Sequence, residues 1–200
     1  MSNIEFNEST HTYTVAGRVV PSVTQLLGAV GVRKNDRWCS ISKSEWCAND
    51  TAANFGKALH AIAVYELSGV EYDCDPAMKP WIDNLKKFFK ANELKGISIE
   101  DPLYSKIYHY CGTPDLFCMM GLRMVVVDWK TATAEQDHWR MQLAAYAQLL
   151  KEHHHLTTLP ETWTVSISDT GYKIDKRSKA EVQYDMNRFL SVLNVYKLAA

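Results

Sequence analysis

Hydrophobic and polar residues alternate in short pieces over residues 4–20, a period of two that is typical of β-strands. Polar turn residues separate the pieces, which predicts a small β-meander. Ser22 follows a proline and precedes Gln25 by three residues, so a capping box should open a short helix that ends near Ala29. Residues 1–35 therefore predict a small N-terminal unit of strands and one helix.

Apolar residues then recur at helical spacing. Residues 36–68 are predicted to be mostly helical, and their Ala- and Leu-rich second half, 54–67, stops before a Ser-Gly pair. A further helix is expected over residues 78–92, where bulky apolar side chains return every three or four positions. Two β-prone pieces, 97–100 and 104–110, predict strands.

The second half of the chain mixes strands and helices. The expected elements are strands at 116–119, 124–127, 163–167 and near 172–174, and helices at 135–152 and 179–198. This order predicts an α/β fold with a central mixed β-sheet flanked by helices. A length of 200 residues suits a single domain over 1–200, with its main core in residues 50–200.

Two aspartates bracket the predicted hairpin around Gly121. If Gly121 and Leu122 are its turn residues, Asp115 and Asp128 stand directly opposed, with Cβ atoms roughly 4.5–5.5 Å apart. Two carboxylates at this distance repel unless a cation or a proton lies between them. Hard oxygen ligands suit Mg²⁺ or Mn²⁺, so this pair indicates a candidate metal site.

Lys130 is two residues beyond Asp128 and therefore points to the same face of the strand. Its ammonium could orient an attacking water or stabilise charge on a phosphate. Three valines before Asp128 indicate a buried strand, where a charge pair is costly unless it has a use. The alternative is a simple salt bridge at the strand end, because one Asp-x-Lys motif occurs readily by chance.

Five short segments stand in order along the chain, at residues 21–27, 56–60, 112–115, 126–131 and 142–146. Together they resemble the RecB-type and phage-exonuclease branch of the PD-(D/E)xK nuclease superfamily, and are similar to the mitochondrial genome maintenance exonucleases. No single segment is specific for this branch, but the occurrence of all five in the same order and at similar distances is strong evidence for the resemblance. The resemblance implies a restriction-endonuclease-like nuclease core within the predicted α/β domain.

The resemblance also implies roles for individual residues. A Mg²⁺ or Mn²⁺ ion would be bound by His60, Asp115, Asp128 and the main-chain carbonyl of Trp129. Lys130 matches the catalytic lysine of the superfamily.

Three further residues match less central positions of the pattern. Gln142 and Tyr146 match a motif that steadies the lysine or the DNA backbone. Glu100 matches an acidic residue that some members carry, the alternative being a position in a surface loop. Because no cysteine follows Cys118, the iron–sulfur cluster of some relatives is not expected.

The net charge and the hydropathy pattern restrict how the chain could bind DNA and where in the cell it could act. The net charge of −1 is low for a nucleic-acid binder, so contacts to DNA would come from a local patch. The candidates lie before or on the His60 helix, with a solvated helical face as the alternative: Arg33, Lys34, Lys43 and Lys57. No apolar run is long enough to span a membrane, and the start lacks a secretory pattern. A cytoplasmic protein is expected, in the host cytoplasm if a phage encodes it.

The expected function is metal-dependent hydrolysis of DNA phosphodiester bonds by an exonuclease of phage or mobile-element recombination or replication. Its expected partner is DNA, with a single-strand annealing or recombination protein as a further candidate. Two alternatives remain: a structure-specific endonuclease, and an inactive DNA-binding module of the same fold. The intact set of Asp115, Asp128 and Lys130 argues against the inactive module.

Overall fold

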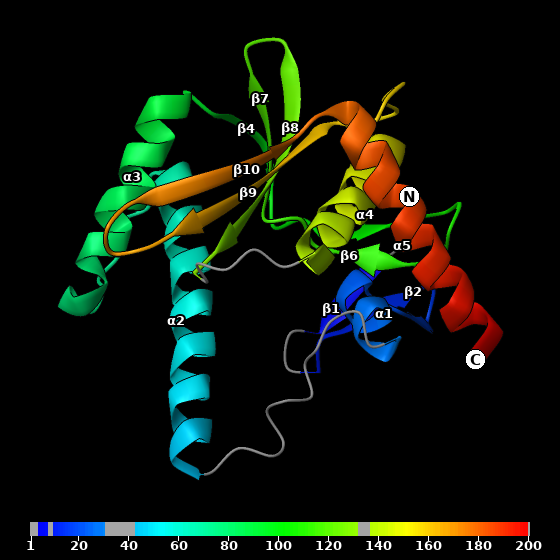
Figure 1. Ribbon diagram of the computed structural model, residues 1–200, viewed down its shortest axis with the longest axis horizontal. Helices are drawn as coiled ribbons and strands as arrows, with labels where there is room; N and C mark the ends of the chain where they lie inside the picture. Colours follow the sequence, from blue (N-terminus) through cyan, green and yellow to red (C-terminus); the bar gives the residue numbers. More distant parts are fainter. Residues whose placement is uncertain (1–3, 8–9, 31–42, 132–136, 200) are drawn as a thin grey trace.

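The computed structural model describes residues 4–7, 10–30, 43–131 and 137–199, with the backbone alone for 43–53 (Figure 1). The chain opens with the predicted antiparallel meander of β1 (Ile4–Asn7), β2 (Thr12–Val15) and β3 (Arg18–Val20). Helix α1 (Val23–Ala29) follows, and both hydrogen bonds of the Ser22–Gln25 capping box are present. The N-terminal predictions are thus confirmed.

A five-stranded sheet in the order β10-β9-β8-β7-β4 forms the centre of the molecule. Its strands are β4 (Lys95–Ile99), β7 (Leu116–Met120), β8 (Arg123–Lys130), β9 (Glu161–Ile167) and β10 (Tyr172–Arg177). Strands β8 and β9 are parallel, whereas the other neighbours are antiparallel. The sheet is therefore mixed, and the predicted α/β fold with a central mixed sheet flanked by helices is confirmed.

The hairpin of β7 and β8 has the predicted register. Met120 pairs with Arg123 and Leu116 with Val127, which leaves Gly121 and Leu122 as the two turn residues. Of these two, only Gly121 has a positive φ, +59°, as a type II′ turn requires at its first position. The period-two pattern fixes which side chains are buried, so a shift by one residue would turn Val126 and Asp128 to the opposite face.

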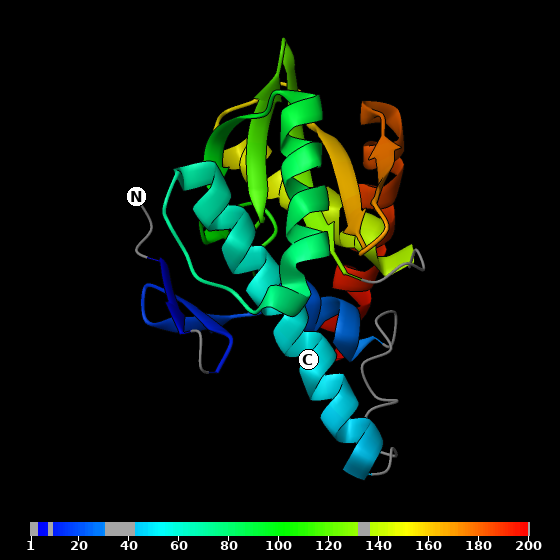
Figure 2. The same cartoon turned by 90° about the vertical axis from the view of Figure 1, so that its left-hand side faces the viewer.

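Helices cover both faces of the sheet (Figures 1 and 2). The helices on one face are α2 (Lys43–Ser68) and α3 (Lys79–Asn92), preceded by the 3₁₀ turn η2 (Pro76–Met78), and those on the other are α4 (Asp137–His153) and α5 (Lys179–Ala199). Val125, Val127 and Trp129 pack toward α2 and α3, whereas Val126 packs toward α4 and α5. Strand β8 thus separates two hydrophobic cores, because alternate side chains point to opposite faces.

The strand predicted over residues 104–110 is wrong. Strands β5 (Leu103–Tyr104) and β6 (Cys111–Gly112) pair with each other, and a turn joins them through a hydrogen bond from Ser105 N to Tyr110 O. Tyr110 is fully buried, and its hydroxyl donates to the carbonyl of Ala145 in α4. The aromatic residues that made this segment look β-prone serve instead to pack the turn against the helices.

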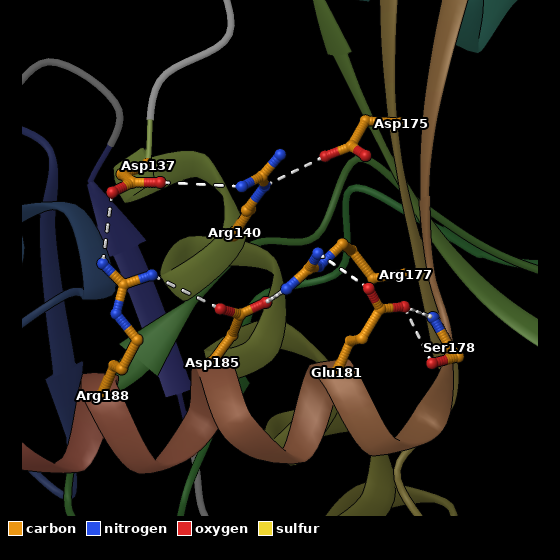
Figure 3. Close-up of polar contacts among 8 residues, drawn as sticks. All are labelled: Asp137, Arg140, Asp175, Arg177, Ser178, Glu181, Asp185 and Arg188. Carbon is orange, nitrogen blue, oxygen red and sulfur yellow. Dashed lines mark hydrogen bonds and ion pairs between the residues drawn. The ribbon is translucent and has the colours of Figure 1, made fainter.

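An ion-pair network joins α5 to β10 (Figure 3). Asp185 of α5 is only 1% exposed, and the guanidinium groups of Arg177 and Arg188 lie 3.0 and 3.5 Å from its carboxylate oxygens. Arg140 of α4 reaches Asp175 of β10 at 3.1 Å. The buried Asp185 carboxylate needs such partners. The pair with Arg177 joins α5 to β10, and the pair between Arg140 and Asp175 holds the start of α4 against the sheet.

Within the described ranges, no helix is long and apolar enough to cross a bilayer.

Candidate functional site

The candidate residues of β8 lie at its C-terminal end. Asp128 and Lys130 share the sheet face that α4 covers, and Trp129 between them points into the core on the other face. Asp115 immediately precedes β7, opposite Asp128 in the continued register of the hairpin. His60 reaches the same place from α2, where its Nε2 lies 3.0 Å from the carbonyl oxygen of Trp129. The structure therefore brings together the four side chains that the sequence placed in one site.

Asp128 is almost completely buried, with its side chain 2% exposed. The ammonium of Lys130 lies 2.6 Å from Asp128 Oδ2, so an ion pair partly compensates the burial of this carboxylate. Burial raises the pKa of Asp128 to about 6, against the opposing effect of Lys130. Because the Asp128 side chain is so poorly solvated, a nearby cation stabilises its ionised form.

Asp115 is held by groups from two other elements. Its Oδ2 accepts a hydrogen bond of 2.8 Å from the backbone N–H of Trp129 and lies 3.4 Å from His60 Nδ1. Although burial opposes ionisation, the His60 imidazolium holds the pKa of Asp115 below its ordinary value. Asp115 is therefore ionised at neutral pH, and the imidazole of His60 bridges it to the Trp129 carbonyl.

The charge of His60 follows from the same contacts. Burial disfavours the imidazolium, but the neighbouring Asp115 carboxylate outweighs this effect and raises the pKa of His60 to about 9. In the metal-free protein the proton on His60 therefore neutralises Asp115. A divalent cation bound here would replace that proton as the positive charge beside the carboxylates.

A pH dependence of stability follows for the metal-free protein. The folded-state pKa of His60, about 9, lies above the ordinary 6.5, so its stabilising effect is complete below pH 6.5. The effect is lost as the pH rises through about 9. We expect the difference in unfolding free energy between the wild type and His60→Gln to shrink over this range, measured by urea denaturation in EDTA. A difference that stays constant from pH 6 to 9.5 would contradict the charge assigned to His60.

A cleft of about 650 Å³ opens beside these residues. Its lining comes from the N-terminal meander, from α1, from α2 and from the segment that carries Asp115. His60, Asp115, Gln142 and Tyr146 all line it, and so does Glu100, whose backbone N–H donates to the carbonyl of Asp115. The cleft therefore joins the residues of the predicted metal and catalytic site that lie outside β8.

Gln142 and Tyr146 stand one turn apart on α4, and Gln142 Nε2 donates to the Tyr146 hydroxyl at 3.0 Å. Burial raises the pKa of Tyr146 well above its ordinary value, so the hydroxyl stays protonated. Among the described residues no hydrogen bond joins either side chain to Lys130. The ammonium of Lys130 instead lies 5.7 Å from the ring centroid of Trp139, besides its pairing with Asp128. That Gln142 and Tyr146 steady the lysine or DNA stays a prediction.

Gly112 is needed where Tyr146 packs. A Cβ at residue 112 would lie 2.6 Å from Cε1 of Tyr146 and 3.1 Å from a methyl carbon of Leu149. We expect Gly112→Ala to lower the free energy of unfolding by about 1–3 kcal/mol, as overpacking of a core does. Urea denaturation measures this, with Gly171→Ala as the matched control, since no atom lies within 4 Å of a Cβ there. Equal stability of the two variants would show that Tyr146 moves aside freely.

The residues predicted to contact DNA divide into three groups. Arg33 and Lys34 lie outside the described residues. Lys43 begins α2, but nothing is described of its side chain. Lys57 is exposed and lines the cleft three residues before His60, so it is the candidate that the geometry supports.

Two features of the site were missed in the sequence. Trp139 lies against Lys130, and the hydroxyl of Tyr13 in the meander lies 2.7 Å from Thr113 Oγ1. Neither pairing has a local sequence signal, because Trp139 comes nine positions after Lys130 and Thr113 comes 100 positions after Tyr13.

The donors that could hold a metal ion are oxygens of the Asp115 and Asp128 carboxylates and of the Trp129 carbonyl. Within the part of the chain that is described, no group of three or more His, Cys, Asp and Glu side chains is arranged to hold a metal ion. Here the third oxygen belongs to the main chain, and His60 already contacts it. The buried Asp128 carboxylate, whose pKa is raised by burial and by the nearby Asp115, is the observation that fits a hard cation.

No protein-family model matches the chain, and neither does any curated protein. A comparison with solved structures finds the crystal structure of SSO0001, which is 13% identical over 71% of this chain and 70% of that chain, with a TM-score of 0.30. A likeness this weak carries no argument about fold or function.

Proposed function

We propose that this chain is a metal-dependent DNA nuclease of the PD-(D/E)xK type and acts as an exonuclease. The observation that supports it best is the convergence of Asp115, Asp128 and Lys130 at the end of β8, with Asp115 on the wall of the cleft. Asp128 is a buried carboxylate with a raised pKa, and burying such a charge is costly unless it serves a purpose. Catalysis by a bound cation is the use that this donor set suits.

The residues fit Mg²⁺ or Mn²⁺ because the donors beside the imidazole of His60 are hard oxygens. Such an ion, when bound, supplies Lewis-acid stabilisation of a phosphate and an activated water. Asp115 and Asp128 would hold it together with the Trp129 carbonyl. His60 would leave its present hydrogen bond to that carbonyl or become a ligand itself.

Lys130 supplies the remaining chemistry. Its side chain is 18% exposed, and its ammonium lies 2.6 Å from Asp128 Oδ2 and 5.7 Å from the ring centroid of Trp139. A positioned ammonium in a site of low dielectric stabilises charge that develops on a phosphate far better than it would in water. It also orients a water for in-line attack.

The cleft has room for a strand end, since a volume of about 650 Å³ lies in the range of sites that bind small molecules. The choice of an exonuclease over an endonuclease follows from the resemblance to phage exonucleases. Lys57 on its wall offers a contact to the phosphate backbone. Recruitment by an annealing or recombination protein stays a prediction of the sequence.

The deciding experiment compares linear with covalently closed circular DNA in Mg²⁺ or Mn²⁺, with Asp128→Ala as the control. We expect the wild type to degrade only linear DNA and the variant to degrade neither. Cutting of both forms would replace the exonuclease with an endonuclease. No cutting by the wild type, with DNA binding retained, would favour the inactive DNA-binding module.

A further inference from the structure

Aromatic rings of the N-terminal meander form one wall of the cleft. Phe6 of β1 and Tyr13 of β2 are directly opposed across the two strands, and their rings stack with centroids 4.4 Å apart. The ring of His11 meets Phe6 edge-on at 5.3 Å. All three side chains line the cleft that also holds His60 and Asp115.

The cluster is fixed at its inner end and open at its outer end. Tyr13 is only 2% exposed, and its hydroxyl lies 2.7 Å from Thr113 Oγ1, two residues before Asp115. By contrast, Phe6 is half-buried and His11 is exposed. The stacked rings therefore have a set position relative to Asp115, while accessible ring surface remains for a ligand.

The charges around the cleft suit a nucleotide. Lys57 stands three residues before His60 on α2, so the two side chains lie on the same side of the helix. A cation beside the carboxylates can contact the phosphate next to the scissile bond, and the rings can accept a base. Base, backbone and scissile phosphate thus each have a counterpart in one cleft. In a closed duplex the faces of the bases are covered by their neighbours, whereas an unpaired base exposes them.

We propose that Phe6 and His11 form a base-stacking subsite for an unpaired DNA strand that enters the cleft. The inference rests on the proposed nuclease function and names its substrate class, single-stranded ends rather than fully paired duplex. The meander then serves as part of the substrate site.

Binding without cleavage tests the subsite. In EDTA, fluorescence anisotropy gives the Kd of three labelled ligands: oligothymidine, the same strand with abasic spacers, and a closed duplex hairpin. The variants are Phe6→Leu/His11→Ala and the milder Phe6→Leu, which keeps an apolar contact with Tyr13. Val19→Ala is the matched control, because Val19 lies in the same meander, is 72% exposed and does not line the cleft.

We expect the double variant to bind oligothymidine at least about fivefold more weakly than the wild type, since base–aromatic stacking contributes that much or more per base. The wild type should lose a similar factor on the abasic strand, and the double variant should lose none. Affinity for the duplex and thermal unfolding should match those of Val19→Ala.

Two results would overturn the subsite: equal affinity of the wild type and both variants for oligothymidine, or equal affinity of the wild type for the normal and abasic strands. Either result leaves the nuclease proposal intact if linear DNA is still degraded in Mg²⁺. If the wild type binds none of the three ligands, the subsite fails, and if it also leaves linear DNA intact in Mg²⁺, the proposed action on DNA fails with it.

Discussion

Asp128→Asn is expected to lower the rate of DNA cleavage by at least about 1,000-fold while the protein remains folded. The substitution keeps the volume of the side chain but removes the charge that would hold the cation. Loss of several kcal/mol of transition-state stabilisation corresponds to about this factor. The measurement is the rate of loss of linear DNA at saturating Mg²⁺, with circular dichroism and thermal unfolding to verify the fold.

Asp175→Asn is the matched control for this variant. Asp175 and Asp128 both pair with Thr164 of β9, so the two carboxylates lie in one row on the same sheet face, about 10 Å apart. Asp175 is bonded to Arg140 and does not line the cleft. Its variant should cleave within about twofold of the wild type. Cleavage by Asp128→Asn at a rate close to the wild type would refute the assignment of the site.

Lys130→Met is expected to slow cleavage by about 100- to 1,000-fold and to retain the binding of Mn²⁺. This is the range by which a positioned proton donor or electrostatic group accelerates a reaction. Because the lysine repels a cation from Asp128, its removal should leave metal affinity unchanged or stronger. Single-turnover cleavage gives the chemical rate, and isothermal titration calorimetry gives the Kd for Mn²⁺.

Lys176→Met serves as the control for lost charge. Lys176 lies on β10, and its ammonium is 4.0 Å from the ring centroid of Trp163, in the core on the other face of the sheet. This variant should keep both cleavage and metal binding. If Lys130→Met lost cleavage and Mn²⁺ binding to the same extent, the lysine would be a support for Asp128 and not a catalytic group.

Local patterns in the sequence were sufficient to predict most elements. The capping box at Ser22 is a contact between residues three apart, and it opens α1 as expected. The register of β7 and β8 follows from a two-residue turn at Gly121 and an alternating pattern. That register alone placed Asp115 opposite Asp128, with Lys130 on the face of Asp128. Such features depend on neighbours in sequence, which is why they can be deduced from sequence.

The remaining features depend on contacts between distant segments. His60 entered the predicted site through the family resemblance alone, because only the packing of α2 against the sheet brings it to the carbonyl of Trp129, 69 residues away. The aromatic residues near Tyr110 looked like a strand, yet burial against α4 and α5 makes them a turn. The sequence by itself determined the strands, the helices and the pairing of the two carboxylates. The tertiary structure decided that Tyr13 meets Thr113 and that the meander forms a wall of the cleft, because these contacts arise only when all elements pack together.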